Sequence, residues 1–318
     1  MRKKYIVTGA AGFIGSHMVD TLLKEDNIVI GIDNLSTGKI FFLKESLKNK
    51  NFLFIKKDLL KQKEIDKLFK HDIEAVFHFS ANADVRYGLL NPRRDLDQNI
   101  IITFNVLEAC RKNKIKKIIF SSTGSIYGES EKIPTSEKSS FPIQTSIYGA
   151  SKLAGEGLIS AYAEGYDIKC WIFRFVSILG PRYTHGHVYD FFKKLKSNSK
   201  SLYVLGNGKQ KKSYLHVYDC INAMLIAINK SKQKVNIFNL GTNEYCKVND
   251  SIRWISKFLD VSPKLKYSGG KRGWIGDNPF IFLDTKRIRS LGWKPKYSIK
   301  ESVEDTLKYF LKNKWLFK

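Results

Sequence analysis

The stretch VTGAAGFIGSH, residues 7–17, places three glycines between an apolar run and an amphipathic segment. Its G-x-x-G-x-x-G spacing permits a tight turn that lets the backbone approach a pyrophosphate, which the amino end of the following helix favours. A glycine triplet alone is a weak signal, and a tight turn without a ligand is the alternative. Its position between a predicted strand and a predicted helix favours a dinucleotide site. The predicted contacts in this turn are Gly9, Gly12, Phe13, Ile14 and Gly15.

An acidic residue ends the second apolar run, at the distance from the glycines that a dinucleotide site requires. Asp33, in GIDN, can accept hydrogen bonds from both hydroxyls of an adenosine ribose. Its negative charge would repel the 2′-phosphate that distinguishes NADP from NAD. The sequence therefore predicts NAD as the cofactor, although Lys39 lies close by.

Short apolar runs alternate with amphipathic segments through the first part of the chain. The runs lie at 4–9, 28–33, 52–58, 75–81, 117–122 and 169–176. Helical patterns lie between them, notably at 13–24, 97–113 and 147–165. This alternation is typical of βαβ units and predicts an α/β fold with a Rossmann-type doubly wound parallel sheet.

The alternation stops after about residue 176, where loops such as GPRYTHGH interrupt short elements. We expect a nucleotide-binding domain at 1–176 and a smaller, irregular α/β lobe for the substrate at 177–318. Segment 214–242 contains one more helical pattern and one more apolar run. It is therefore predicted to return to the first domain.

The composition argues against several classes of protein. With 43% hydrophobic residues and only 7 prolines in 318 residues, the chain is suited to a buried core. Its four cysteines form no C-x-x-C pair and join no histidine cluster, so we expect reduced thiols, no metal site and a cytoplasmic location. No apolar run approaches the ~20 residues of a membrane span, and the N-terminus does not resemble a signal peptide.

The formal net charge of +25 has two interpretations. A strongly basic chain can bind an anionic partner such as a nucleic acid, or it can simply have a lysine-rich solvated surface. The lysines are scattered over nearly all segments instead of forming a stripe or a tail. This distribution favours the second interpretation and predicts no nucleic-acid partner, while an anionic small-molecule substrate is compatible with either.

A tyrosine and a lysine lie one helical turn apart in TSIYGASKLAGEG, residues 145–157. Tyr148 and Lys152 would share one face of a helix, as a proton-transfer pair requires. Two other pairs have the same spacing: Tyr189/Lys193 and Tyr267/Lys271. The first pair alone follows a hydroxyl cluster, FSSTGSIYGE (120–129), at the carboxyl end of a predicted strand, where ligands bind in open α/β sheets. We therefore predict that Tyr148 and Lys152 form the functional pair.

These features together resemble the extended short-chain dehydrogenase/reductase family, in its NAD-dependent epimerase/dehydratase group. The resemblance covers nearly the full chain, and within the family it is closest to nucleotide-sugar 4-epimerases of the UDP-glucose type. Four further segments carry it: NIIITFNVLEACRK (99–112), RFVSILGPR (174–182), VLGNGKQKKSYLHVYD (204–219) and LDTKRIRSLGWKP (283–295). The combination is specific for the family and less so for the reaction.

The resemblance implies a catalytic set of Thr123, Tyr148 and Lys152. Tyr148 would act as the base at the sugar 4-hydroxyl, with its pKa lowered from ~10 by the Lys152 ammonium and the positive nicotinamide. Thr123 would hydrogen-bond the 4-oxygen. The protein would hold the cofactor and a 4-keto sugar between two half-reactions, and a homodimer formed through 97–113 and 147–165 is also implied.

The remaining contacts are implied by position. For the cofactor they are Asn34, Asp58, Leu59, Phe79, Ser80, Ala81, Asn99 and Ser121, besides the glycine turn, Asp33, Tyr148 and Lys152. For a nucleotide-diphosphate sugar they are Thr123, Ser177, Lys212, Arg272 and Asp277. Two of these depart from the family pattern, since Lys212 replaces the usual arginine and Ser177 an asparagine that many relatives carry. Both departures leave the exact substrate open.

Three functions stay open at this point. The first is a nucleotide-sugar 4-epimerase, and the second is a 4-dehydrogenase or a dehydratase. The third is an idle NAD-binding protein that holds an anionic polymer, which the intact catalytic set disfavours. Gly124 and Ser125 stand where the family's 4,6-dehydratases carry an acid pair, so water elimination is not expected.

Overall fold

The structure, a computed structural model, describes residues 2–70, 72–140, 143–273 and 280–317. The chain divides into two compact units. The first consists of Met1–Ile126, Ser146–Arg174 and Met224–Phe238, and the second of Tyr127–Thr145, Phe175–Ala223 and Asn239–Lys318. Segment 127–145, which the predicted boundary keeps with the first domain, thus lies in the second unit. There Thr135 pairs with Leu283, and the Glu137 carboxylate accepts a hydrogen bond of 2.9 Å from Asn239 N.

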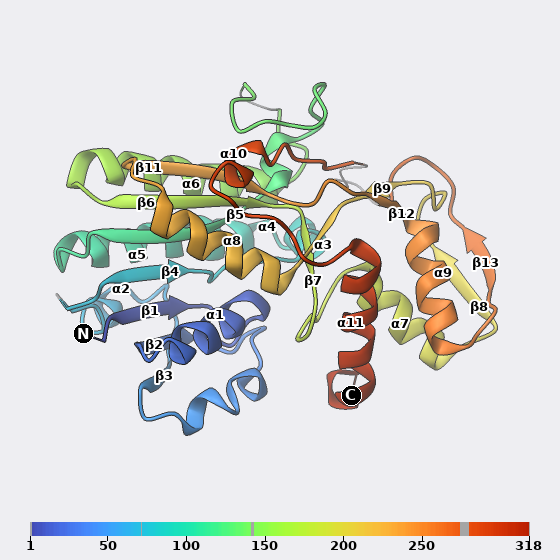
Figure 1. Cartoon of the computed structure of the whole chain (residues 1–318), viewed down its shortest axis with the longest axis horizontal. Coiled ribbons are helices and arrows are strands. Elements are labelled where there is room, and N and C mark those ends of the chain that lie inside the picture. Colours follow the sequence, from blue (N-terminus) through green and yellow to red (C-terminus); the bar gives the residue numbers. More distant parts are fainter. Residues whose placement is uncertain (1, 71, 141–142, 274–279, 318) are drawn as a thin grey trace. The chain divides into compact units, whose positions relative to one another are not determined.

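Within the described residues, seven strands form the main sheet, in the order β11-β6-β5-β4-β1-β2-β3 (Figure 1). The strands are β1 (Lys4–Thr8), β2 (Ile28–Asp33), β3 (Phe52–Lys56), β4 (Ala75–His78), β5 (Lys117–Thr123), β6 (Lys169–Phe175) and β11 (Val235–Leu240). β1 pairs in parallel with β2 and β4, and β2–β3 and β4–β5 are parallel as well. The chain runs outward from β1 in both directions, so the β1–β4 boundary is the switch point where doubly wound sheets bind ligands. The predicted fold is confirmed.

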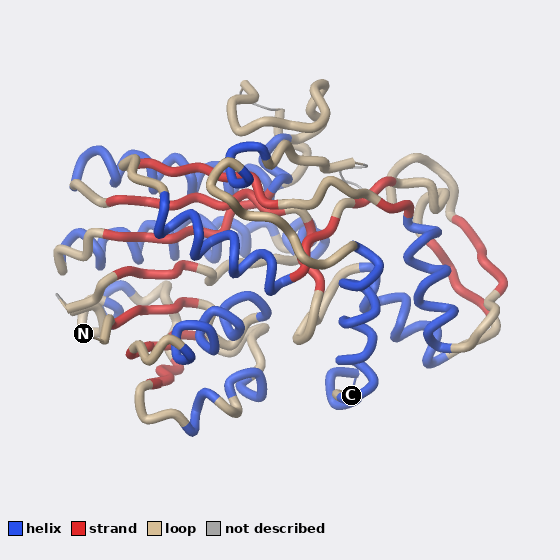
Figure 2. The backbone as a smooth tube through the Cα atoms, in the orientation of Figure 1, coloured by secondary structure: helices blue, strands red, loops and turns tan. Residues whose placement is uncertain are grey.

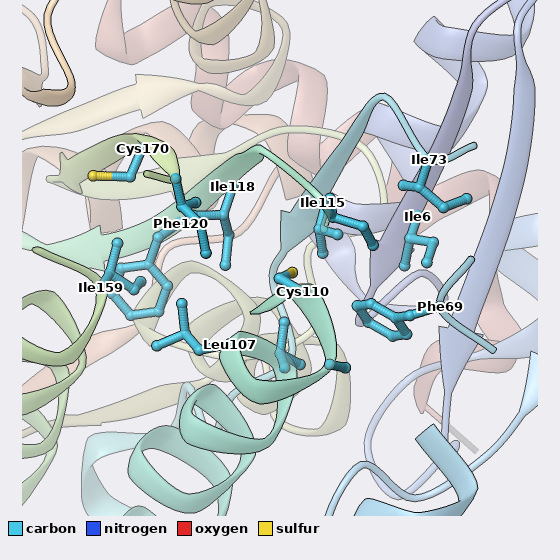
Figure 3. Close-up of a cluster of buried hydrophobic side chains, with 14 of the residues drawn as sticks. Ile6, Phe69, Ile73, Leu107, Cys110, Ile115, Ile118, Phe120, Ile159 and Cys170 are labelled. Atoms are coloured by element: carbon cyan, nitrogen blue, oxygen red, sulfur yellow. The ribbon is translucent and has the colours of Figure 1, made fainter. Parts of the chain in front are cut away.

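Alternate residues along the strands face the two sides of this sheet. Ile6, Val76, Ile118 and Phe120 pack against α5 (Ile102–Lys112) and α6 (Ile147–Tyr166) in one core cluster (Figure 3). The opposite face, which includes Tyr5, is covered by α1 (Phe13–Lys24) and by α8 (Val217–Lys230) (Figure 1). Each fully buried side chain of this kind contributes about 1.5–3 kcal/mol, so both faces stabilise the sheet.

Two helix starts matter for the site. Ser146 caps α6, because its hydroxyl accepts a hydrogen bond of 3.0 Å from Gly149 N. The helix predicted at 97–113 is not uniform. Its first part, Leu96–Ile101, is a wider π-helical turn that passes into α5 at Ile102. Such turns often occur at functional sites, and this one carries Asn99.

Shorter elements complete the first unit. They are the helical turns η1 (Ile40–Leu43), η2 (Ser46–Lys48) and η4 (Gly124–Tyr127), of which η4 ends in the second unit, and the helices α2 (Gln62–Ile65), α3 (Val85–Leu90) and α4 (Pro92–Asp95). The four cysteines of the chain are buried free thiols. Among the described residues, no helix combines the length and apolar character that crossing a bilayer requires.

The second unit consists of helices, short strands and long loops (Figure 2). Its helices are α7 (His187–Ser197), α9 (Val248–Leu259), α10 (Lys286–Arg289), α11 (Ile299–Lys312) and the turn η5 (Lys314–Phe317). Its strands are β7 (Ser177–Leu179), β8 (Ser201–Val204), β9 (Lys211–Lys212), β10 (Tyr214–His216), β12 (Cys246–Lys247) and β13 (Lys264–Tyr267). In the part of the chain that the structure describes, they pair as β10–β7, β12–β9 and β13–β8.

Candidate active site

The glycine turn between β1 and α1 cannot be built from larger residues. Gly9 has φ +68°, and a Cβ atom there would lie 2.8 Å from the backbone of Phe79 and Ser80. A Cβ atom on Gly15 would lie 2.0 Å from the Gly9 carbonyl oxygen. The turn therefore packs directly on the end of β4, which brings the predicted residues Phe79 and Ser80 beside the glycines.

The amino end of α1 is suited to an anion. Within the described residues, no side chain caps this end at Gly12, and the first turn contains no acidic residue. The backbone N–H groups of the first turn, which includes Phe13 and Ile14, can therefore serve a phosphate, and the helix dipole favours its charge. This arrangement fits the pyrophosphate of a dinucleotide.

Backbone N–H groups hold the Asp33 carboxylate beside the same glycine turn. One carboxylate oxygen accepts a hydrogen bond of 3.0 Å from Ala11 N, and the other accepts one of 2.7 Å from Leu35 N. Burial raises the pKa of Asp33, and the two N–H bonds oppose this shift. A carboxylate oxygen has two lone pairs, so each can still accept a ribose hydroxyl. The residues present fit the adenosine half of NAD.

Other predicted cofactor residues lie on the neighbouring strand ends. Asn34 Nδ2 lies 3.4 Å from a carboxylate oxygen of Asp58, whose other oxygen accepts a hydrogen bond of 2.9 Å from Leu60 N. Leu59 between them is buried. Ala81 is half-buried just beyond Ser80 at the end of β4. These side chains extend the dinucleotide site along the carboxyl edge of the sheet.

We expect cofactor-stripped protein to bind NAD⁺ much more tightly than NADP⁺, because a 2′-phosphate would meet the buried Asp33 carboxylate. The preference should be at least roughly tenfold, or about 1.4 kcal/mol. Asp33→Asn should reduce it mainly by weakening NAD⁺ binding. Titration calorimetry with both nucleotides measures this, with Asp72→Asn, an exposed carboxylate paired with Lys4, as the control. Equal affinities in the wild-type protein would contradict the assignment.

The three predicted catalytic residues lie together. Thr123 ends β5, and its side chain interacts with the hydroxyl of Tyr148, in the first turn of α6. Thr123 Oγ1 also accepts a hydrogen bond of 3.1 Å from Ser125 N. Lys152 is buried, and its Nζ donates a hydrogen bond of 2.7 Å to the carbonyl oxygen of Ser121. The end of β5 and the start of α6 thus assemble one hydroxyl–phenol–ammonium group.

Burial dominates the electrostatics of this group. Burial raises the pKa of Tyr148 to about 12, opposed by the Thr123 hydrogen bond and reinforced by Asp95. Burial lowers the pKa of Lys152 to about 7, opposed by Glu156 and Asp95. In the protein alone, desolvation therefore disfavours the phenolate and weakens the charge of Lys152, whereas the predicted lowering of the Tyr148 pKa also relied on the positive nicotinamide. Forming the phenolate near neutral pH requires a further positive charge close to the pair.

A buried ion pair anchors α6 to the sheet. Arg174, in β6, donates two hydrogen bonds, of 3.0 and 2.7 Å, to the two carboxylate oxygens of Glu156, which lies one turn after Lys152. The Ser122 hydroxyl donates to the same carboxylate. These residues were not predicted from the sequence, although an acidic residue four positions after Lys152 could have indicated them.

The side chains of His78 and Asn99, near the Tyr148–Lys152 pair, form hydrogen bonds with other groups of the protein. The His78 ring lies 2.8 Å from Thr8 Oγ1 and 3.1 Å from Thr103 Oγ1. Burial, and to a lesser extent the charge of Lys152, lowers the pKa of His78 to about 3. His78 is therefore a neutral structural residue. The Asn99 amide oxygen accepts a hydrogen bond of 2.8 Å from Asn82 N, and its nitrogen donates to Asp95 and Ser151. The side chain of Asn99, predicted to contact the cofactor, is thus engaged within the protein.

Three predicted substrate residues, Ser177, Lys212 and Arg272, lie in the second unit, whereas Thr123 lies in the first. Ser177 is exposed in β7, and its register partner Tyr214 contacts His187 at 2.6 Å. Lys212 is half-buried in β9. Burial, and to a lesser extent the charge of Lys212, lowers the pKa of His187 to about 3. The side chains of Lys212, Tyr214 and His187 therefore lie close together in the second unit.

The other two predicted substrate residues lie further along the chain. Arg272 forms an exposed ion pair with Glu129. Asp277 lies outside the described residues.

The two other Y-x-x-x-K pairs have ordinary surroundings. The Tyr189 hydroxyl donates a hydrogen bond of 2.8 Å to the carbonyl oxygen of Leu316, and the Tyr267 hydroxyl donates one of 2.9 Å to Asn249. Their lysines, Lys193 and Lys271, are exposed. Neither pair has a buried ammonium of the kind that Lys152 provides.

The chain is similar to known proteins over nearly its whole length. Residues 5–241 match the model of the NAD dependent epimerase/dehydratase family. The chain is 33% identical to the UDP-glucose 4-epimerase of Thermotoga maritima, solved with UDP-glucose, with a TM-score of 0.87 and coverage of 98% and 99% of the two chains. A UDP-glucuronic acid 4-epimerase from Bacillus cereus, solved with UDP-glucuronic acid and NAD, is 30% identical with a TM-score of 0.87 and coverage of 97% and 99%.

A third solved structure has a different sugar. The UDP-N-acetylglucosamine 4-epimerase of Methanobrevibacter ruminantium, in complex with UDP-N-acetylmuramic acid, is 29% identical with a TM-score of 0.87 and coverage of 98% and 99%. The prediction of NAD as the cofactor is confirmed by the family match, which spans the glycine turn, Asp33 and the Tyr148–Lys152 pair. By its sequence and its structure, the chain belongs to the NAD-dependent epimerase/dehydratase family.

Proposed function

We propose that the protein is an NAD-dependent 4-epimerase of a UDP-sugar, acting through a transient 4-keto sugar. The observation that carries this proposal is the grouping of Thr123 and Tyr148 with the buried Lys152 at the carboxyl end of β5. Such a group can remove and return one proton at a sugar hydroxyl. The similar solved structures named as UDP-sugar 4-epimerases support the same reaction.

Each side chain has a separate task. Tyr148 accepts the proton of the sugar 4-hydroxyl and later returns it to the same oxygen. Thr123 donates a hydrogen bond to that oxygen and keeps the phenol oriented. Lys152, held by the Ser121 carbonyl, supplies the positive charge that stabilises the phenolate. Bound NAD supplies reversible uptake of hydride from the sugar C4.

The segment after Thr123 favours epimerisation over water elimination. Gly124 and Ser125 lie in the helical turn η4, and neither offers a carboxylic acid to protonate a leaving hydroxyl. Ser125 instead donates its backbone N–H to Thr123. The 4-keto sugar therefore has reduction at C4 as its forward route, and a 4-dehydrogenase that stops after one transfer is the second candidate function.

The rest of the proposal concerns the substrate and the assembly. Lys212 and Arg272 supply cations for the diphosphate, and Ser177 contributes a hydroxyl. The sugar is of the glucose/galactose type, with or without a 2-N-acetyl group. We also propose a homodimer through α5 and α6, because Phe104 and Tyr166 are 42% and 47% exposed on these helices. A cytoplasmic location remains a prediction from the sequence.

The purified protein, without added NADH, should interconvert UDP-glucose and UDP-galactose or their N-acetyl forms. NMR of the anomeric protons follows the sugars, while absorbance of the reduced nicotinamide should stay at a low steady level. UDP-glucuronate completes this panel of substrates, because one of the similar solved structures is a UDP-glucuronic acid 4-epimerase. Stoichiometric reduced nicotinamide without any epimer would favour the 4-dehydrogenase. A 4-keto-6-deoxy product would contradict the exclusion of a dehydratase.

A further inference from the structure

A buried carboxyl group lies next to the proposed catalytic pair. Asp95 ends α4 and has a relative exposure of 0%. Its Oδ1 accepts hydrogen bonds of 2.7 Å from Asn82 Nδ2 and 3.3 Å from Asn99 Nδ2. Its Oδ2 has no hydrogen-bond partner among the described residues. Burying a carboxyl group in this way is costly, so its presence calls for an explanation beyond packing.

Hydrogen bonds connect Asp95 to the helix that carries Tyr148. Asn99 Nδ2, which donates to Asp95, also donates a hydrogen bond of 2.8 Å to Ser151 Oγ. The Ser151 hydroxyl in turn donates one of 2.8 Å to the carbonyl oxygen of Tyr148. The π-helical turn at Leu96–Ile101 sets the position of Asn99 in this chain of bonds. A shift of the Asp95 carboxyl group would therefore be transmitted to the first turn of α6.

The structure also makes room for this carboxyl group. A Cβ atom on Gly88, in α3, would lie 2.1 Å from Asp95 Oδ2. Among the charged and titratable groups that face Asp95, Asp84 at the start of α3 is of like charge, and Lys152 and Tyr148 belong to α6. The Asp95 charge raises the pKa of both Tyr148 and Lys152. Asp95 is thus coupled to the pair by bonds and by charge.

We propose that Asp95 is a positioning residue for the Tyr148–Lys152 pair, which holds the first turn of α6 through Asn99 and Ser151 and places a negative charge beside the pair. The proposal rests on the proposed function, since it assigns Asp95 a role only through those two side chains. A neutral polar residue of the same shape could fill the space. It could accept the same two hydrogen bonds at one oxygen, but it would not supply the negative charge near Lys152.

The test substitutes Asp95→Asn in the full-length protein, which preserves shape and removes charge. We expect kcat to fall roughly 10- to 100-fold with little change in KM, because a small misplacement of a reacting group has an effect of this size. The pH profile of kcat should move to lower pH, since without the Asp95 charge the pKa of Tyr148 and that of Lys152 both fall. Asp72→Asn, the same change at an exposed residue paired with Lys4, should resemble the wild type in both respects.

A second readout does not depend on the reaction. The difference in tyrosinate absorbance between the wild type and Tyr148→Phe, followed against pH, gives the pKa of Tyr148 directly. The same difference, measured with and without Tyr148→Phe in the Asp95→Asn background, should give a lower pKa. A lowered value with no epimerase activity in any form would refute the proposed function and leave the coupling of Asp95 to Tyr148 standing. An unchanged value together with wild-type kcat and pH profile would overturn the role of Asp95.

A third variant covers the case in which Asp95→Asn does not fold. Ser151→Ala keeps the Asp95 charge and removes the hydroxyl that accepts from Asn99 and donates to the Tyr148 carbonyl oxygen. We expect a lower kcat with an unshifted pH profile and nearly unchanged KM. Wild-type kcat in a folded Ser151→Ala protein would overturn the positioning role.

Discussion

Replacing Tyr148 with phenylalanine should lower kcat by at least about 100-fold, the low end of the contribution of a positioned acid–base group. The change removes the hydroxyl that interacts with Thr123 and leaves the ring packing nearly intact. The melting temperature should therefore change little. Steady-state kinetics with the best nucleotide sugar of the panel, together with thermal unfolding, separate lost chemistry from lost stability.

The two other tyrosines with Y-x-x-x-K spacing provide matched controls. Tyr189→Phe and Tyr267→Phe remove hydroxyls that bond to Leu316 and Asn249, outside the proposed catalytic set. Both variants should keep kcat close to the wild-type value. Equal losses at all three positions would show that the choice of Tyr148 is wrong.

Breaking the buried pair of Arg174 and Glu156 should have the largest effect on stability. Arg174→Met removes one partner and leaves the Glu156 carboxylate with a side-chain exposure of only 5% and without its cation. We expect a loss of about 3–5 kcal/mol in the free energy of unfolding. Urea denaturation followed by circular dichroism measures it, provided that the transition stays two-state.

The double variant Arg174→Met/Glu156→Leu is the matched control for that loss. It removes both charges together and leaves apolar side chains of similar size, which often restores or even raises stability. We expect it to recover most of the loss, although Ser122 also loses its acceptor. A double variant as unstable as Arg174→Met alone would contradict the explanation by an unpaired buried charge.

Local patterns in the sequence were sufficient for the main sheet and for part of the site. Buried parallel strands have continuous apolar sequences, so the run predicted at 117–122 corresponds to β5, Lys117–Thr123. The glycine turn and Asp33 were also predictable, because their function depends on backbone geometry within one βαβ unit. Tyr148 and Lys152 were predicted because, unlike the two other pairs of the same spacing, they follow a hydroxyl cluster at the end of a predicted strand.

The rest depends on contacts between distant parts of the chain. Asn99 and Ser151 are 52 residues apart, and no pattern in either segment indicates that a hydrogen bond joins them to Asp95. The raised pKa of Tyr148 likewise follows from burial, which only the folded chain reveals. Segment 127–145 joins the second unit through pairing of Thr135 with Leu283, a contact that local periodicity does not encode.

The most direct test of the proposed reaction follows the hydrogen atom at C4 of the sugar. UDP-glucose deuterated at C4, or the N-acetyl analogue if that is the better substrate, is incubated with the purified protein in ordinary water. NMR and mass spectrometry then report the configuration and the deuterium content at C4. The proposed mechanism predicts a sugar inverted at C4 that retains its deuterium, because the atom leaves C4 and returns to it within one turnover. Inversion with deuterium replaced by solvent hydrogen, or no inversion with any sugar of the panel, would contradict it.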